Sequence, residues 1–372
     1  MGDVQNKRKL ILEDGSEFEG FSFGSKEAKM FEIVFNTSMV GYQEIISDPS
    51  YTYQGVVMTY PLIGNYGMCK DDYETLTPTI SAMIVREYCD EPSNFRAEKT
   101  LGEVMEKYDI TGISGLDTRQ IARHIRDYGC CRAYIVPYEK DSREALIELR
   151  EWKPRTDAVN KVSTKEIFDY ADKMGLEANE ETYHIVAIDC GMKMNILREL
   201  YKRNCKITVV PWNTSAKEIE PVNPDGVFIS NGPGDPEDVW DTISTIKELK
   251  GKYPIFGICL GHQIISLAYG AKTYKLKFGH RGGNHPVKNL KKDKVEITSQ
   301  NHSYAVDDKT VADTGLKVTH VNLLDNTVEG VECVEDKVFS VQYHPESAPG
   351  PQDSSYLFDE FIDIIKLSRE GK

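Results

Sequence analysis

Three side chains with complementary chemistry lie in two short motifs: Cys259 in GICLGHQ, and His344 and Glu346 in QYHPE. A cysteine nucleophile needs a base that takes its proton, and that base needs a third group to fix its tautomer. An extended backbone across Pro345 would place His344 and Glu346 on the same side. Taken singly, a cysteine usually packs in a core and a His-Pro-Glu sequence usually forms a turn. The prediction of a catalytic triad therefore rests on the combination of the two motifs.

The position of Cys259 strengthens this prediction. G-x-C-x-G, preceded by apolar PIFGI and followed by helix-like HQIISLAYG, is typical of a sharp strand-to-helix turn that exposes a nucleophile. A second loop, SNGPGDP, offers the backbone N–H groups of Gly232 and Gly234 to a developing oxyanion, and Leu260 at the start of the helix offers another. The alternative interpretation of SNGPGDP is a plain turn before a helix.

These motifs fit an α/β domain in the second half of the chain. Apolar strand-like segments alternate with helical ones from about residue 183, which favours a mostly parallel sheet covered on both faces. We expect strands at 183–190, 206–212, 225–230 and 254–258, with helices at 194–203, 236–253 and 262–270. The reactive loops would then lie at the carboxyl ends of strands.

The first half of the chain has a different pattern. Residues 7–24 resemble a hairpin with a turn at 13–15, and short β-type runs surround the helix-like segment 116–129, which predicts a mixed α+β domain. We place this domain at residues 1–154, a polar linker at 155–182, and the α/β domain at 183–372.

Composition excludes several classes of protein. The chain has 372 residues and a net charge of −14, which argues against a nucleic-acid partner. It has no signal-peptide pattern and no apolar run long enough for a membrane span, and its eight cysteines form no C-x-x-C pair, so we expect a cytoplasmic protein. His280, His285 and His302 have no regular ligand spacing, and we predict no metal site.

Five motifs together resemble the class I glutamine amidotransferase family. They are SNGPGDP, GICLGHQ, KFGHRGGNHPV, SQNHSYAV and QYHPES, in this order over residues 183–372. The resemblance implies that Cys259 attacks the carboxamide of glutamine, that His344 carries the proton to the departing ammonia, and that Glu346 orients His344. Water would then hydrolyse the glutamyl thioester to glutamate.

The first half is similar to the carbamoyl-phosphate synthase small-chain family. The similarity lies in residues 34–67 and 113–129, so that it extends over nearly the whole chain. It implies a glutamine site made of Ser50, Gly232, Gly234, Leu260, Gln263, Asn301, Ser303 and Tyr304. The family usually has Gly-Phe where this chain has Ser303-Tyr304, and a positive φ at Ser303 would strain the backbone by about 1 kcal/mol or more.

The same resemblance implies a separate large subunit that binds ATP and Mg²⁺, receives the ammonia and makes carbamoyl phosphate from bicarbonate for pyrimidine or arginine synthesis. No cofactor is expected in this chain, which lacks a G-x-x-x-x-G-K-[ST] loop. The alternatives are a glutaminase of another synthase, such as those that make anthranilate or guanylate, a cysteine hydrolase of the same architecture, and a non-catalytic regulatory subunit.

Overall fold

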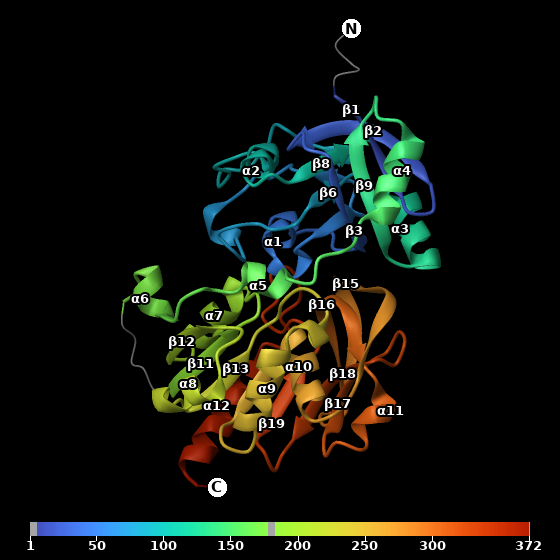
Figure 1. Cartoon of the computed structure of the whole chain (residues 1–372). Coiled ribbons are helices and arrows are strands. Elements are labelled where there is room, and N and C mark those ends of the chain that lie inside the picture. The colour runs from blue at the N-terminus through green and yellow to red at the C-terminus, as the bar shows by residue number, and fades with distance from the viewer. Residues whose placement is uncertain (1–5, 178–182, 372) are drawn as a thin grey trace. The chain divides into compact units, whose positions relative to one another are not determined.

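The chain folds into two compact units, Met1–Arg155 and Thr156–Lys372. The computed structural model describes residues 6–177 and 183–371 (Figure 1). Each unit has its own sheet and its own buried apolar core, which is the usual property of a domain.

The first unit is a closed barrel with short helices around it. Its strands follow the order β1-β2-β8-β6-β4-β3-β9, and β9 pairs with β1 to close the barrel. Their bounds are β1 (Lys7–Leu12), β2 (Glu17–Gly24), β3 (Lys29–Asn36), β4 (Gln54–Met58), β6 (Ala82–Ile84), β8 (Thr111–Ser114) and β9 (Cys131–Pro137). The pairs β3–β4, β4–β6 and β6–β8 are parallel and the others antiparallel.

Helices and a small second sheet complete this unit. They are α1 (Tyr42–Ser47), α2 (Leu101–Lys107), α3 (Thr118–Tyr128), α4 (Ser142–Glu151), and the paired strands β5 (Leu62–Ile63) and β7 (Glu87–Tyr88). The predicted hairpin is present as β1 and β2, with Gly15 at φ 92° in the turn. The mixed α+β expectation for this half is therefore confirmed.

The second unit contains one ten-stranded sheet of order β10-β12-β11-β13-β14-β19-β18-β17-β15-β16. Its strands are β10 (Phe168–Asp169), β11 (Tyr183–Asp189), β12 (Cys205–Pro211), β13 (Gly226–Ile229), β14 (Ile255–Ile258), β15 (Thr273–Asn289), β16 (Lys294–Val306), β17 (Lys317–Asn322), β18 (Val328–Cys333) and β19 (Val338–Val341).

Only the centre of this sheet is parallel. The neighbours β12, β11, β13, β14 and β19 run parallel, whereas β10 and the block from β15 to β18 pair antiparallel. The expectation of a mostly parallel sheet is therefore corrected to a mixed sheet. The physical reason is that no crossover helix returns the chain to a parallel position in residues 273–333: β15–β16 and β17–β18 are antiparallel hairpins, and β17 pairs antiparallel with β15.

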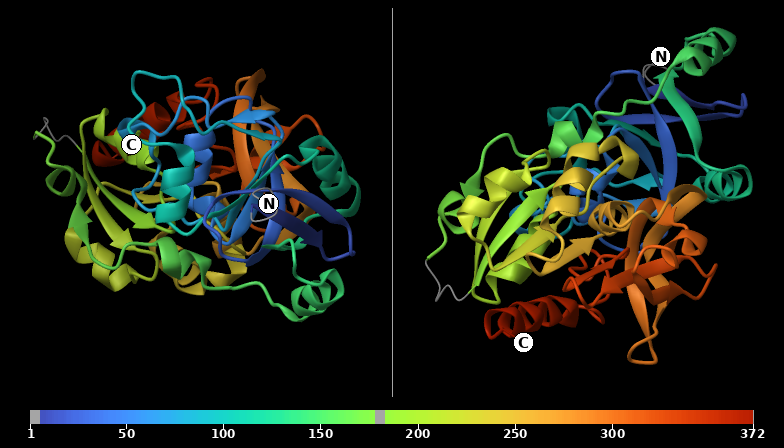
Figure 2. Two further views of the ribbon diagram at one scale, coloured as in Figure 1. Left: turned by 90° about the horizontal axis from the view of Figure 1, so that it is seen from above. Right: turned by 60° about the horizontal axis from the view of Figure 1, so that its bottom comes forward.

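Helices cover both faces of the parallel centre, which explains why its strands are apolar without alternation. The helices are α7 (Met194–Tyr201), α8 (Ala216–Ile219), α9 (Trp240–Leu249), α10 (Leu260–Ala268) and α12 (Tyr356–Arg369), whereas the short α11 (Asp308–Val311) packs beside β17. Val186 and Ile188 of β11 pack in one core with α9 and α10, while Ile185 and Ala187 pack in another with α7 and α12. Figure 2 shows α12, in red, on the opposite side of the strands from the yellow helices.

The segment predicted as a linker, 155–182, carries structure of its own. It contains α5 (Ala158–Val162), β10 and α6 (Tyr170–Met174), and β10 pairs antiparallel with β12. The Thr164 N–H donates to Asp189 Oδ2 at 2.7 Å, which ties this segment to the end of β11. Residues 156–177 therefore belong to the second unit, and 178–182 lie outside the described residues.

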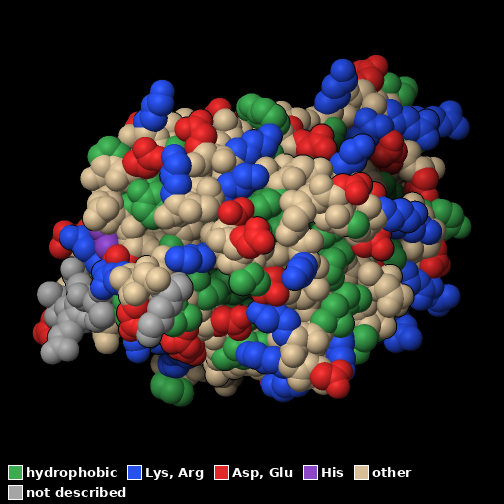
Figure 3. All heavy atoms as spheres, turned by 90° about the horizontal axis from the view of Figure 1, so that it is seen from below, with side chains coloured by type: hydrophobic (Ala, Val, Ile, Leu, Met, Phe, Trp, Pro, Cys, Tyr) green, Lys and Arg blue, Asp and Glu red, His purple; other side chains and the backbone are tan. Residues whose placement is uncertain are grey.

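Two further observations concern the lengths of the helices and the distribution of charge on the surface. Within residues 6–177 and 183–371, no helix is both long and apolar enough to cross a bilayer. On the face drawn in Figure 3, acidic and basic side chains are interspersed rather than separated into large fields of one sign.

Candidate active site

The three predicted reactive segments follow neighbouring parallel strands of the second unit. SNGPGDP follows β13, Cys259 follows β14, and QYHPE follows β19. In the sheet, β14 lies between β13 and β19, with Ile258 opposite Val341. The carboxyl ends of these strands therefore bring QYHPE together with two segments that precede it by more than 80 residues, as the α/β pattern predicts.

Cys259 occupies a strained turn between β14 and α10. Its backbone has φ 56° and ψ −104°, a conformation that residues other than glycine rarely adopt. Its N–H donates to Val341 O at 2.9 Å, which fixes the turn against β19. The strain places the thiol at the head of the helix, in the geometry that the G-x-C-x-G motif predicts.

The glycines beside Cys259 are required by close packing. A Cβ on Gly261 would lie 2.3 Å from Ile229 O, and one on Gly257 would lie 2.8 Å from Gly261 O. The first turn of α10 thus lies against both β13 and β14, and only glycine fits two residues before and two residues after the cysteine.

His344 and Glu346 form the predicted pair. His344 Nδ1 donates to Glu346 Oε1 at 2.7 Å, and both side chains are almost fully buried. Burial disfavours the imidazolium, but the Glu346 carboxylate and the Cys259 sulfur together raise the pKa of His344 to about 10. The pair therefore holds a proton at Nδ1 and directs Nε2 away from Glu346.

Cys259 and His344 are positioned for proton exchange. Within the described part of the chain, His344 Nε2 is buried and makes no hydrogen bond of ordinary geometry. The Cys259 Sγ lies 3.6 Å from Asn301 O, and the sulfur contributes to the raised pKa of His344. This arrangement can move a proton between a thiol and a leaving group.

Lys193 is a further member of the site that the sequence interpretation missed. Its Nζ donates to Glu346 Oε1 at 2.9 Å and to Ser347 O at 2.6 Å, and its side chain is 3% exposed. Burial raises the pKa of Glu346, but Lys193 and His344 outweigh that effect and lower it to about 2. The available signal was a lysine just past the carboxyl end of β11, a parallel strand beside β13.

The glycine-rich loop after β13 lies close to the turn that carries Cys259. A Cβ on Gly232 would meet Cys190 O at 2.2 Å and Leu260 Cδ2 at 2.8 Å, while Gly234 has φ 91°. Leu260 is the first residue of α10, so its N–H has no acceptor within the helix. The predicted oxyanion donors therefore have suitable places, and their catalytic role stays a prediction.

Gln263, a predicted glutamine-binding residue, makes hydrogen bonds within the chain through its side-chain amide. Its Nε2 donates to Tyr304 O and to Gln342 Oε1, each at 2.9 Å. These bonds connect α10, β16 and the end of β19. Gln342 is fully buried and was not singled out from the sequence.

The other predicted glutamine-binding residues divide between the two units. Asn301, Ser303 and Tyr304 lie on β16; Asn301 is buried beside Cys259, and the other two are half-buried. Ser50 lies in the first unit, buried in a 3₁₀ turn where its N–H donates to Asp48 Oδ1 at 2.8 Å. Its participation in a glutamine site stays a prediction.

The backbone at Ser303 does not need a glycine. Ser303 lies inside β16 and is absent from the residues with positive φ in the described chain. Its Oγ accepts a hydrogen bond from the buried Arg281, across the ladder from β15. The strain considered for this departure from the family pattern is therefore not present.

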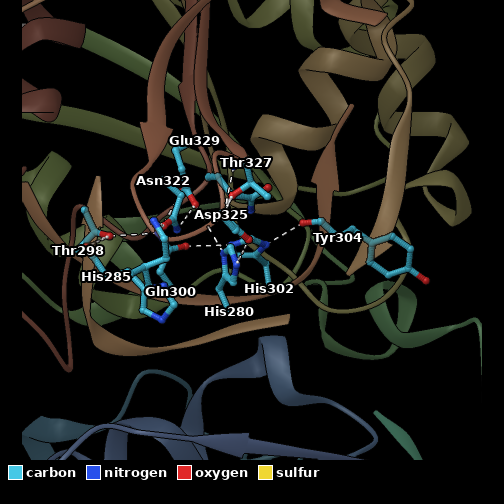
Figure 4. Close-up of polar contacts among 12 residues, drawn as sticks. His280, His285, Thr298, Gln300, His302, Tyr304, Asn322, Asp325, Thr327 and Glu329 are labelled. Atoms are coloured by element: carbon cyan, nitrogen blue, oxygen red, sulfur yellow. Dashed lines mark hydrogen bonds and ion pairs between the residues drawn. The ribbon is translucent and has the colours of Figure 1, made fainter. Parts of the chain in front are cut away.

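The histidines of KFGHRGGNHPV and SQNHSY form a buried polar cluster (Figure 4). His280 Nε2 donates to Asp325 Oδ2 at 2.9 Å, and its Nδ1 lies 3.7 Å from Glu329 Oε1. Burial disfavours its charge, but the two carboxylates raise the pKa of His280 to about 9. Burial and the neighbouring His280 hold the pKa of His302 well below its usual range.

Three side chains of this cluster are close enough to share a metal ion. Ligand atoms of His280, His302 and Glu329 lie within 4.8 Å of one another. His302 is already bonded to Tyr304 O at 2.7 Å and to Gln300 Oε1 at 2.9 Å, and Glu329 accepts from Gln300 at 3.0 Å. These contacts form a hydrogen-bond network, and the prediction of no metal remains a prediction.

Comparisons with known proteins agree over nearly the whole chain. Family models for "Glutamine amidotransferase class-I" and "Carbamoyl-phosphate synthase small chain, CPSase domain" match residues 186–364 and 10–135. Carbamoyl phosphate synthase small chains from Fusobacterium nucleatum and Bacillus caldolyticus are 51% and 52% identical. The alignments cover 96% and 98% of this chain, and 98% and 99% of the relatives.

A solved structure of a glutamine amidotransferase from Thermotoga maritima is similar over 51% of this chain and 85% of its own, with 16% identity and a TM-score of 0.37. The two family models and the identity of about half of all residues over full length decide the assignment. The chain belongs to the family of carbamoyl phosphate synthase small chains and has a class I glutamine amidotransferase domain.

Proposed function

We propose that this chain is the glutaminase subunit of a glutamine-hydrolysing carbamoyl-phosphate synthase. The observation that carries the proposal is the strained turn at Cys259 beside the buried His344–Glu346 pair, at the ends of two adjacent parallel strands. Family membership and the class I amidotransferase domain support the same activity.

In the proposed reaction, Cys259 Sγ attacks the carboxamide carbon of glutamine. His344 receives the thiol proton and passes it to the amide nitrogen as the C–N bond breaks, so that ammonia leaves and a glutamyl thioester remains. A water molecule, deprotonated by His344, then attacks the thioester and releases glutamate and the thiol. Glu346 and Lys193 stay charged and hold the imidazole in place.

Oxyanion stabilisation would come from the backbone around Gly232 and from Leu260 N–H. One such donor is worth about 3 kcal/mol of transition-state stabilisation. Asn301 lies beside Cys259, and Gln263 of α10 is bonded to the backbone of Tyr304. With Ser303 of the same strand, these residues would supply neutral polar groups for the amine and carboxylate of glutamine.

We further propose that the ammonia passes to a large subunit that binds ATP and Mg²⁺ and makes carbamoyl phosphate for pyrimidine or arginine synthesis. The names of the relatives as "small chain" support a larger partner. The eight cysteines are free thiols, which supports a reducing, cytoplasmic location.

Substitution of the nucleophile tests the glutaminase step. In the assembled enzyme, Cys259→Ser should abolish synthesis from glutamine and preserve synthesis from added ammonia. Cys89→Ser, which alters a half-buried thiol in the other unit, is the matched control and should preserve both activities. Equal loss of both activities in Cys259→Ser would overturn the assignment.

Gentle purification from native cells tests the partner. A co-purifying large ATP-binding chain at equal stoichiometry, with synthesis of carbamoyl phosphate from glutamine and bicarbonate, is the expected result. A different synthase as partner would contradict the proposed product while leaving the glutaminase site intact.

A further inference from the structure

The first unit has a hollow of about 680 Å³ that the proposed glutaminase reaction does not use. Its volume lies in the range of roughly 300 to 1,000 Å³ that is common for small-molecule sites. It is lined by four arginines together with apolar side chains and threonines.

The hollow lies at the carboxyl ends of the parallel strands of the barrel. Strands β3, β4, β6 and β8 are consecutive parallel neighbours. Phe35 is near the end of β3, Thr59 follows β4, Arg86 follows β6, and α3 begins shortly after β8. Ligand sites of α/β proteins form at this kind of edge, because the loops that follow parallel strands converge there.

Four arginines surround this hollow, in a chain whose net charge is −14. Arg119, Arg123 and Arg126 are spaced by four and three residues along α3 and therefore share one face of the helix. Arg86 comes from a different segment and lines the same hollow, so the cations converge from two elements.

Most of these cations lack an acidic partner. Arg126 pairs with Asp127 at 2.8 Å, whereas Arg86, Arg119 and Arg123 make no ion pair within residues 6–177 and 183–371. Like charges on one helix face repel one another. A bound anion would relieve that repulsion, and the guanidinium fork matches the paired oxygens of a phosphate.

The apolar and hydroxyl side chains that line the hollow indicate which groups a ligand would carry besides its phosphates. Phe35, Pro61 and Ala122 give an apolar area suited to a ring, and the hydroxyls of Thr37 and Thr59 can bond to phosphate oxygens or ribose. The eleven-residue helix α3 also directs the positive end of its dipole toward this edge.

We propose that this hollow binds a small ligand with two or more adjacent phosphates and a planar apolar group, of the class of nucleoside di- and triphosphates. The site is distinct from the glutamine amidotransferase site, which lies in the other unit, and does not depend on it. Its specificity would rest on arginine and hydroxyl groups rather than on a glycine-rich phosphate loop.

The test is calorimetric titration of the full chain, expressed without any partner, at 0.15 M salt. The probes are ATP, ADP, adenosine and inorganic tripolyphosphate. We expect ATP to bind more tightly than ADP, tripolyphosphate to compete with ATP, and adenosine to show no binding. Arg119→Gln combined with Arg123→Gln should weaken ATP binding at least tenfold.

Arg143→Gln is the matched control, because Arg143 is an exposed arginine of α4 in the same unit and outside the hollow. It should leave ATP binding unchanged, and circular dichroism should show that all variants remain folded. No binding of ATP, or equal weakening by Arg143→Gln, would overturn the proposal. Arginine-dependent binding of polyglutamate without binding of ATP would replace it with a docking surface for an acidic protein.

Discussion

The Nζ atom of Lys193 lies 2.9 Å from Oε1 of Glu346, inside the second unit and away from water. The same carboxylate oxygen accepts the hydrogen bond from His344 Nδ1 at 2.7 Å. Burial alone would raise the pKa of this carboxyl group, but the charge of Lys193, and after it that of His344, lowers it to about 2. Lys193 is thus a positioning residue that acts on His344 through Glu346.

Lys193→Met should lower kcat for glutamine hydrolysis at least tenfold and should move the acidic limb of the pH–rate profile to higher pH. The reason is that the lowered pKa of Glu346, about 2, depends first on Lys193. Loss of one partner of a buried ion pair should also reduce the free energy of unfolding by about 3–5 kcal/mol.

Lys193→Arg separates electrostatics from packing, because it retains the charge. Partial recovery of the pH profile in this variant is expected. A normal pH profile in Lys193→Met would show that the lysine only fills space.

His280 should make the stability of the protein depend on alkaline pH. Its pKa is about 9 in the folded chain against an ordinary value of 6.5, so its contribution is complete below pH 6.5 and is lost as pH rises through 9. The free energy of unfolding should therefore fall by up to about 3 kcal/mol over that interval. In His280→Gln, urea unfolding at pH 6.5 and 9 should show a clearly smaller fall.

His285 provides the control for this measurement. Burial and the charge of His280 lower its pKa to about 4, so it is neutral throughout the interval from 6.5 to 9. His285→Gln should keep the alkaline loss of stability. An unchanged pH dependence in His280→Gln would contradict the assignment of the proton to His280.

The reactive segments were predictable because each follows an apolar strand. The segment 254–258 became β14, and the expected meeting of Cys259 with His344 and Glu346 follows from the adjacency of β14 and β19. Lys193 was not predictable in the same way, because its partner Glu346 is 153 residues away and no local pattern records that contact.

The antiparallel half of the sheet was also missed. Strand β15 has register shifts between residues 275 and 280 and between 282 and 285, which interrupt the alternation that identifies a strand. The pairing of His280 with His302 depends on that irregular register. The buried histidine cluster therefore appears only when the strands are paired in three dimensions.

Ser303→Gly tests whether this departure from the family pattern stores strain. Because Ser303 lies in ordinary strand geometry and its Oγ accepts from Arg281, the change should lower the free energy of unfolding by about 1 kcal/mol. Denaturant unfolding of Ser303→Ala measures the loss of the hydrogen bond to Oγ. The further difference between Ser303→Ala and Ser303→Gly measures the effect of glycine on the backbone. An increase in stability in Ser303→Gly would indicate strain that the backbone conformation does not show.

Cys259 itself should reverse the usual order of alanine and glycine. Glycine normally weakens a structure by about 0.5–1 kcal/mol relative to alanine, but at φ 56° and ψ −104° a Cβ is strained by about 1–3 kcal/mol. Cys259→Gly should therefore have a free energy of unfolding about 1 kcal/mol higher than that of Cys259→Ala, measured by urea unfolding. Both variants lack the nucleophile. Cys333, a buried residue of β18 without positive φ, is the control, and there the alanine variant should be the more stable. The same order at both positions would mean that the turn at Cys259 relaxes freely and stores no strain for the exposure of its thiol.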